Sequence, residues 1–231
     1  EIVEKMKREG FEEPTYYEML LSIAFVYFAE QKVDIAVVEV GIEGKYDATN
    51  LVDAPVVVMT NIGLDHTEIL GDTVEKIANE AVFAIRKNSI VVTGEEKNEI
   101  LKIINDRCVD TDSKVLRIDK DFSVVIKNSS SNGVVFDFKF GNKVFKDISL
   151  SLIGDYQAKN AALAIAAVLN LQKLGFTISE EDIRSAMSNA FFPGRFEIVN
   201  FGVEVAPKFD RGPVLGFPPA SARLNAPSDQ R

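Results

Sequence analysis

The chain has 231 residues, of which 46% are hydrophobic and 26% charged, a balance that is typical of globular proteins. Its formal net charge of −9 disfavours a nucleic-acid backbone or an anionic membrane surface as a partner. The single cysteine, Cys108, excludes an internal disulfide, and no apolar run approaches the roughly 20 residues that span a bilayer. We therefore expect a cytoplasmic protein without membrane or nucleic-acid partners.

The first long element is a helix over residues 15–31, because apolar residues recur there at helical spacing. Residues 34–40 are rich in β-branched side chains and predict a buried strand, with Glu39 near its carboxyl end. A buried carboxylate is costly unless it is paired or binds a metal. We favour a metal ligand, since Gly41 and Gly44 would let the backbone approach a ligand; the alternative is a solvated strand tip.

The chain's only histidine, His66, lies in a loop between an apolar strand at residues 56–60 and a helix at residues 74–86. Asp72, with Glu75 three residues later, is a candidate cap for that helix. Ligands of open parallel sheets bind at the carboxyl ends of the strands, and an imidazole there can hold a metal or move a proton. The alternative is a loop histidine without a role.

A strand at residues 89–93 and a helix at residues 97–107 continue the alternation that is typical of a parallel sheet with right-handed crossovers. From Lys114 the pattern changes to short strands separated by turn signals, which predict an antiparallel part. These strands are expected at residues 115–118, 122–127, 134–140 and 144–150. The predicted fold class is α/β, with a mainly parallel sheet flanked by helices and a small antiparallel part.

A long apolar helix is predicted at residues 158–174, followed by a helix that Ser179 caps. Asn160 lies in the first turn of the long helix, where the helix dipole favours phosphate. A capping or solvated asparagine is the alternative. Arg195 follows a tight Phe-Pro-Gly turn and precedes a strand at residues 196–199; it is either a phosphate contact or an exposed surface arginine.

The periodic pattern stops near residue 205, and five of the eight prolines follow it. We therefore expect one domain over residues 1–205 and a disordered tail, foreign to the domain, over residues 206–231.

Five segments match one known family, and they occur together and in order. They read PTYYEMLLSIAFVYFAE, VDIAVVEVGIEGKYDATN, TNIGLDHTEILGDTVEKIANE, GDYQAKNAALAIAA and FPGRFEIV. Their combination resembles folylpolyglutamate synthase/dihydrofolate synthase of the Mur ligase superfamily, over roughly residues 15–199. The domain that it resembles is the central ATP-binding domain.

The resemblance implies an ATP-dependent ligase that joins glutamate to a folate or dihydropteroate carboxylate through an acyl phosphate. It implies ATP and Mg²⁺ as cofactors and a monomer. By resemblance, Glu39 and His66 are the catalytic positions, with Glu39 as a magnesium ligand and His66 holding a second magnesium. Gln157, Asn160 and Arg195 are implied to contact ATP.

The chain also departs from the family. It contains no glycine-rich phosphate loop that ends in Gly-Lys-Ser, and its last residues do not resemble the family's C-terminal domain. Ala81 stands where the family has a lysine that becomes carbamylated, Glu43 where it has glycine, and Lys45 where it has arginine.

These departures leave two hypotheses. One is a truncated ligase fragment that is inactive by itself. The other is a non-catalytic relative with at most weak nucleotide or metal binding, which Ala81 favours. A peptidoglycan amino-acid ligase of the same superfamily is a weaker third choice.

Overall fold

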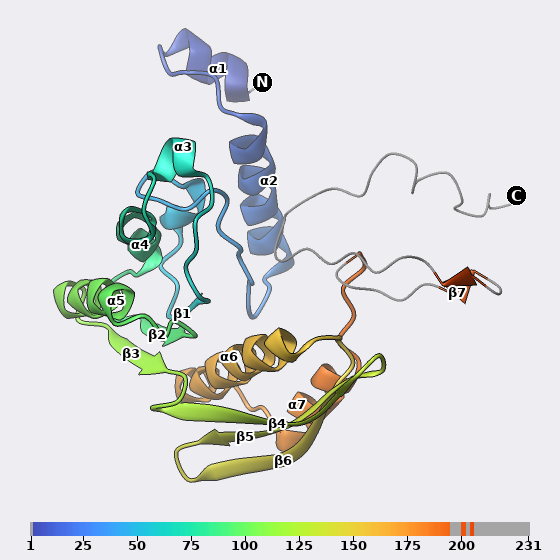
Figure 1. The fold of residues 1–231 in the computed structure, drawn as a ribbon. Helices are drawn as coiled ribbons and strands as arrows, with labels where there is room; N and C mark the ends of the chain where they lie inside the picture. Colours follow the sequence, from blue (N-terminus) through green and yellow to red (C-terminus); the bar gives the residue numbers. More distant parts are fainter. Residues whose placement is uncertain (1, 195–199, 202–203, 206–231) are drawn as a thin grey trace, which may run out of the picture. The chain divides into compact units, whose positions relative to one another are not determined.

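The structure is a computed structural model that describes residues 2–194, 200–201 and 204–205 (Figure 1). The chain forms two compact units, residues 1–118 and 119–231, and each unit is considered by itself. Within the described ranges, no helix combines the length and the apolar composition that crossing a membrane requires. The predicted boundary near residue 205 stays a prediction, because residues 206–231 lie outside those ranges.

The first unit is built on a three-stranded parallel sheet in the order β1-β2-β3. These strands are β1 (Val56–Met59), β2 (Ile90–Thr93) and β3 (Lys114–Arg117). Helix α4 (Val74–Ala81) leads from β1 towards β2, and α5 (Asn98–Asp110) connects β2 with β3 (Figure 1). This alternation is the predicted parallel α/β pattern, and the predicted fold class is confirmed.

One face of this sheet carries the hydrophobic core of the unit. Val57 and Met59 of β1 are buried, whereas Val58 between them is 45% exposed, as the alternation of side chains along a strand requires. The core also contains buried residues from both helices, namely Ile77, Ala78, Ala81, Ile100, Ile104 and Cys108. The ends of β1 and β2 are therefore fixed by helices that pack on the sheet.

Two predictions about this unit are wrong in detail. We expected residues 115–118 to begin the antiparallel part, but β3 pairs with β2 in parallel. The crossover helix α5 returns the chain to the same end of the sheet, which makes a parallel pair the natural outcome. We expected Asp72 to cap the next helix; instead the Thr73 hydroxyl accepts from the Lys76 N–H, and Asp72 pairs with the Lys76 ammonium at 2.7 Å.

The strand predicted at residues 34–40 is absent from the structure, in which these residues form neither helix nor strand. Most of their side chains are exposed, and Val37 is 92% exposed. A strand exists only when a neighbour pairs with its N–H and C=O groups, and within the described part of the chain none pairs with this run. A β-branched sequence is therefore not sufficient here.

The helix predicted at residues 15–31 is present as α2 (Tyr16–Gln31), and Thr15 and Glu18 form a capping box at its start. None of its residues is buried. Four shorter helical elements complete the described part of the first unit. They are α1 (Ile2–Arg8), the 3₁₀ turn η1 (Ala48–Leu51), α3 (Thr67–Leu70) and the 3₁₀ turn η2 (Val82–Ala84), which follows α4.

The second unit contains a three-stranded antiparallel sheet of β4 (Phe122–Ser130), β5 (Gly133–Phe140) and β6 (Lys143–Leu150). Phe136 and Phe138 of β5 are both 0% exposed, which confirms that the alternating phenylalanines line a core.

Helices follow this sheet in the second unit (Figure 1). Helix α6 (Asp155–Leu171) packs on β4 and β5 and continues as η3 (Gln172–Leu174), while α7 (Glu180–Ser188) packs on β6. The predicted cap at Ser179 is present, with a capping box to Asp182. The short strands β7 (Asn200–Phe201) and β8 (Glu204–Val205) pair with each other, and the strand predicted at residues 196–199 lies outside the described residues.

Candidate functional site

His66 lies in the loop that follows β1, at the carboxyl end of that strand. Its backbone is left-handed, with φ of +46°, and its carbonyl accepts hydrogen bonds from the N–H groups of Ile69 and Leu70. Its own N–H donates to Asp65 Oδ1 at 2.8 Å, and the ring atom Nε2 lies 3.9 Å from the same oxygen. The imidazole is 36% exposed, so it is available to a ligand from solution.

Glu39 is exposed and lies at the end of the unpaired run 34–40. Burial raises the pKa of the Tyr17 phenol, and the negative charges of Asp47 and Glu39 raise it further. The Glu39 carboxylate therefore lies within electrostatic range of Tyr17, which comes from α2. A Cβ at Gly41 would lie 2.8 Å from the Tyr17 ring, so a glycine at this position leaves the space that the ring occupies.

Asp47 organises the loop between Glu39 and η1. Its Oδ2 accepts three successive backbone N–H groups, from Gly41 at 2.9 Å, Ile42 at 3.0 Å and Glu43 at 3.1 Å. Its Oδ1 accepts from the N–H and the hydroxyl of Thr49. Partial burial alone would raise the pKa of Asp47, but these hydrogen bonds outweigh it and lower the pKa.

Glu43 connects this loop electrostatically with the histidine loop. Burial raises the pKa of the Glu43 carboxyl, the charges of Asp47 and Asp65 raise it further, and His66 acts in the opposite direction. Because such effects require proximity, Glu43 lies near both Asp65 and His66. Its φ of +73° explains why a glycine is the easier residue at this position.

The Asp65 carboxylate lies 3.9 Å from the His66 ring, and the Glu43 carboxyl interacts electrostatically with both residues. Carboxylate oxygens are the donors that Mg²⁺ prefers. Among the described residues, no three histidine, cysteine, aspartate or glutamate side chains are already arranged to hold a metal. This does not conflict with magnesium, which commonly uses one or two carboxylates and takes its remaining ligands from water and phosphate. The residues present therefore fit Mg²⁺ in the type of their donor atoms, although they do not form a complete coordination shell.

Gln157 and Asn160 lie on the first turns of α6, in the second unit. The Asn160 side-chain amide donates to Gln157 Oε1 at 3.1 Å, so these two predicted nucleotide contacts are neighbours. Asn160 is exposed, so a ligand from solution can reach it. Arg195, the third predicted contact, lies outside the described residues.

Ala81 is the last residue of α4 and is only 6% exposed. It packs in the hydrophobic core of the first unit, and its methyl group has no donor atom that could bind a metal. The neighbouring Glu80 instead contacts the Asp47 loop, because its Oε2 accepts the Lys45 N–H at 2.9 Å. A Cβ at Gly44 would lie 2.9 Å from the same oxygen, so the carboxylate and the loop meet closely.

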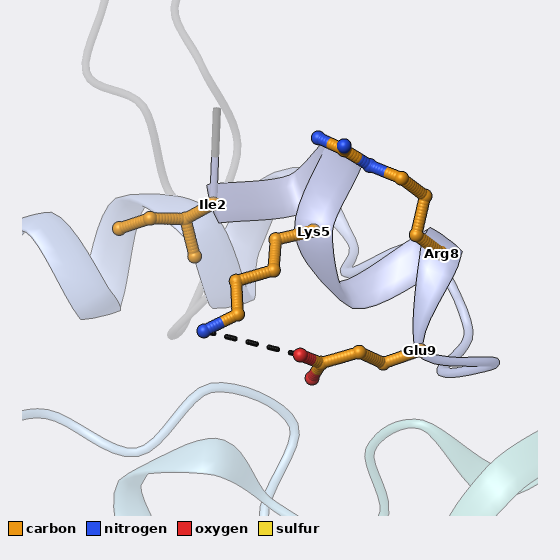
Figure 2. A pocket seen from close by; sticks show the side chains of 4 residues that line it. All are labelled: Ile2, Lys5, Arg8 and Glu9. Atoms are coloured by element: carbon orange, nitrogen blue, oxygen red, sulfur yellow. Dashed lines mark ion pairs between the residues drawn. The ribbon is translucent and has the colours of Figure 1, made fainter.

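Figure 2 shows a hollow on α1 that is separate from these residues. It is lined by Ile2, Lys5, Arg8 and Glu9, and Lys5 pairs with Glu9 at 3.9 Å. All four side chains are exposed and come from one short helix and the residue that follows it, so we assign no function to this hollow.

Sequence reasoning missed the two carboxylates that hold the site's loops. Asp47 could have been found, because an aspartate two residues before a threonine is typical of a turn that the side chain caps. Glu95 could not, because its bond to the Ile62 N–H joins residues 33 positions apart. The structure alone identifies it.

Comparisons with known proteins identify the family of this domain. A family model described as the Mur ligase middle domain matches residues 6–168. The dihydrofolate synthase/folylpolyglutamate synthase of Bacillus subtilis is 36% identical over 199 residues, covering 85% of this chain and 46% of that protein. The folylpolyglutamate synthase of Lacticaseibacillus casei is 32% identical over 187 residues, covering 80% of this chain and 44% of that protein.

Solved structures match as well. A structure described as an FPGS–AMPPCP complex superposes with a TM-score of 0.81 at 30% identity, covering 86% of this chain and 49% of that one. The folylpolyglutamate synthase of Thermotoga maritima gives a TM-score of 0.76 at 37% identity, covering 86% of this chain and 44% of that one. This chain thus spans somewhat less than half the length of these relatives.

Proposed function

The chain belongs to the Mur ligase family through its middle domain, and from this premise we propose that it is part of an ATP-dependent ligase that joins glutamate to a folate or dihydropteroate carboxylate. The observation that carries this proposal is the histidine loop at the end of β1, together with the similarity to folylpolyglutamate synthases on both sides of it. Relatives described as AMPPCP and AMPPCP–folate complexes support the nucleotide and the folate.

The reaction has two steps. An oxygen of the substrate carboxylate attacks the γ-phosphorus of ATP, and ADP leaves, which gives an acyl phosphate. The glutamate amine then attacks the carbonyl carbon, phosphate leaves, and the amine loses a proton as the amide forms. Both steps need the phosphate charge to be neutralised and the reactants to be held in place.

We assign Glu39 and His66 to the neutralisation of the phosphate charge. The Glu39 carboxylate and the His66 imidazole would bind Mg²⁺, which supplies charge neutralisation of the phosphates when it is bound. The Asp65 carboxylate accepts the backbone N–H of His66, and its negative charge lies beside the His66 ring. Asp47 holds the loop that follows Glu39 by three N–H groups.

We assign Gln157 and Asn160 to ATP, because they are neighbours on the first turns of α6. Arg195 is proposed as a further ATP contact on the basis of the sequence alone. We further propose residues 1–205 as the family domain with a separate tail over residues 206–231, a monomer, and a cytoplasmic location.

A second function is favoured by Ala81. Its buried methyl group cannot carry a carbamate, so the chain could instead be a non-catalytic relative that binds nucleotide or metal weakly. The two functions differ in one respect that can be measured, which is turnover when the rest of a ligase is supplied.

The test is a chimera in which this chain replaces the matching segment of the Bacillus subtilis relative. Glutamate- and folate-dependent release of ADP is measured for the chimera, for its His66→Ala variant and for a control, Lys87→Ala, at an exposed position. We expect turnover that falls at least about 100-fold in His66→Ala and stays unchanged in the control. Turnover that appears only after Ala81→Lys would favour the non-catalytic relative, and equal turnover in His66→Ala would remove His66 from the site.

A further inference from the structure

Glu95 is the only carboxylate among the buried polar residues of the described chain, and it is 3% exposed. It follows β2 by two residues, on the sheet edge at which the histidine loop leaves β1. Burying a carboxylate costs free energy unless several hydrogen bonds satisfy its oxygens. A position of this kind therefore requires an explanation.

The hydrogen bonds of Glu95 join two separate segments. Its Oε1 accepts from the N–H groups of Glu96 at 2.8 Å and Lys97 at 2.9 Å, at the start of α5. Its Oε2 accepts from the N–H of Ile62 at 2.9 Å, in the loop after β1. One carboxylate thus fastens the histidine loop to the beginning of a core helix.

Ile62 is the point at which the histidine loop is anchored. Its side chain is 8% exposed and belongs to the core, whereas Thr60, Asn61 and residues 63–65 are exposed. The next buried residue is Leu70, beyond His66. Between these two anchors the chain has to place His66 in a left-handed conformation, which a loosely held loop would not maintain.

We infer that Glu95 is a positioning residue, which holds the loop of His66 at the carboxyl edge of the sheet through the N–H of Ile62. Its importance for ligation rests on the proposed function, but the positioning itself does not. A carboxylate suits this role because both of its oxygens accept, and they satisfy three N–H groups at once. A glutamine retains only one accepting oxygen, so it leaves at least one of the two segments unsatisfied.

The test is amide hydrogen exchange of the 231-residue chain, measured by NMR. In Glu95→Ala we expect the Ile62 amide to exchange at least about tenfold faster, because a charge-assisted hydrogen bond is lost. The Val92 amide of the core strand should be unchanged. In Glu95→Gln the same change should appear at Ile62 or at Glu96 and Lys97. Glu99→Gln, which removes an exposed carboxylate from the first turn of α5, is the control and should leave Ile62 unchanged.

A second readout separates positioning from general stability. His66 is the only histidine, so its ring gives one signal in a histidine-labelled sample. We expect that signal to shift or broaden in Glu95→Ala while amides of β2 keep their positions. An unchanged Ile62 amide and His66 ring in Glu95→Ala would overturn the inference. A loosened loop in Glu95→Ala combined with no turnover in the unchanged chimera would refute the proposed function and still support the positioning.

Discussion

Two hydrophobic helices of this protein have opposite surroundings. Helix α6 buries eight of its residues and packs on β4 and β5, whereas α2, which is at least as apolar, buries none. The sequence predicts both helices, although α6 begins at Asp155, three residues before its predicted start. The difference shows that local sequence determines whether a helix forms, while its burial depends on what lies next to it in space.

The largest expected difference between the two helices is in core packing. Ile165 of α6 is 1% exposed and Ile23 of α2 is 65% exposed. We expect Ile165→Ala to lower the free energy of unfolding by about 2–5 kcal/mol and Ile23→Ala by less than about 0.5 kcal/mol. Urea unfolding followed by circular dichroism measures both. Equal losses would mean that α2 is covered in solution, and the comparison would then fail.

The loop at residues 41–43 should be held by hydrogen bonds to the charged Asp47 carboxylate instead of by apolar packing. We expect Asp47→Asn to cost about 1–2 kcal/mol, at the low end for hydrogen bonds to a charged group because Asp47 is only half-buried.

This loss should depend on pH. The pKa of Asp47 is lowered in the folded state, so its stabilisation is complete above the unfolded value of about 3.9 and disappears as the pH falls through the folded value. Unfolding curves of both proteins between pH 3 and pH 7 should therefore converge at the acidic end. A constant difference across that range would contradict the charge-assisted anchoring.

The smallest effect concerns the two capping boxes, which are chemically alike. Ser179→Ala should lower the unfolding free energy by about 1 kcal/mol, because α7 packs on β6 through the buried Ile183. Thr15→Ala should reduce the helicity of α2 without moving the unfolding midpoint, since α2 buries nothing. Circular dichroism separates the two quantities. A shift of the midpoint in Thr15→Ala would show that α2 is coupled to the core.

Signals that act over a few residues could be predicted from the sequence. The capping boxes at Thr15 and Ser179 and the alternation of Phe136 and Phe138 are of this kind. The position of His66 after β1 was also predictable, because an apolar run followed by a polar loop marks a strand end. The left-handed backbone of His66 was not, since no glycine indicated it.

Features that depend on distant partners could not be predicted. Residues 34–40 have the composition of a strand, but no strand in the described chain pairs with them. The pairing of β3 was predicted as antiparallel and is parallel, because the sequence of a single strand does not determine the direction of its partner. No local sequence signal indicates the role of Glu95, because its hydrogen bond from the Ile62 N–H joins residues 33 positions apart. The roles of Glu39, His66, Gln157, Asn160 and Arg195 stay predictions.

The central proposal is that Glu39 and His66 hold Mg²⁺, and Mn²⁺ tests it most directly. Mn²⁺ has similar ligand preferences and broadens the NMR signals of nearby nuclei. In a titration with Mn²⁺ and ATP, we expect the His66 ring and the amides of Gly41 and Glu43 to broaden first. The acidic pair Asp137 and Asp147, which Lys127 already neutralises, should respond only at higher concentration. Broadening at Asp137 and Asp147 before His66 would contradict the account.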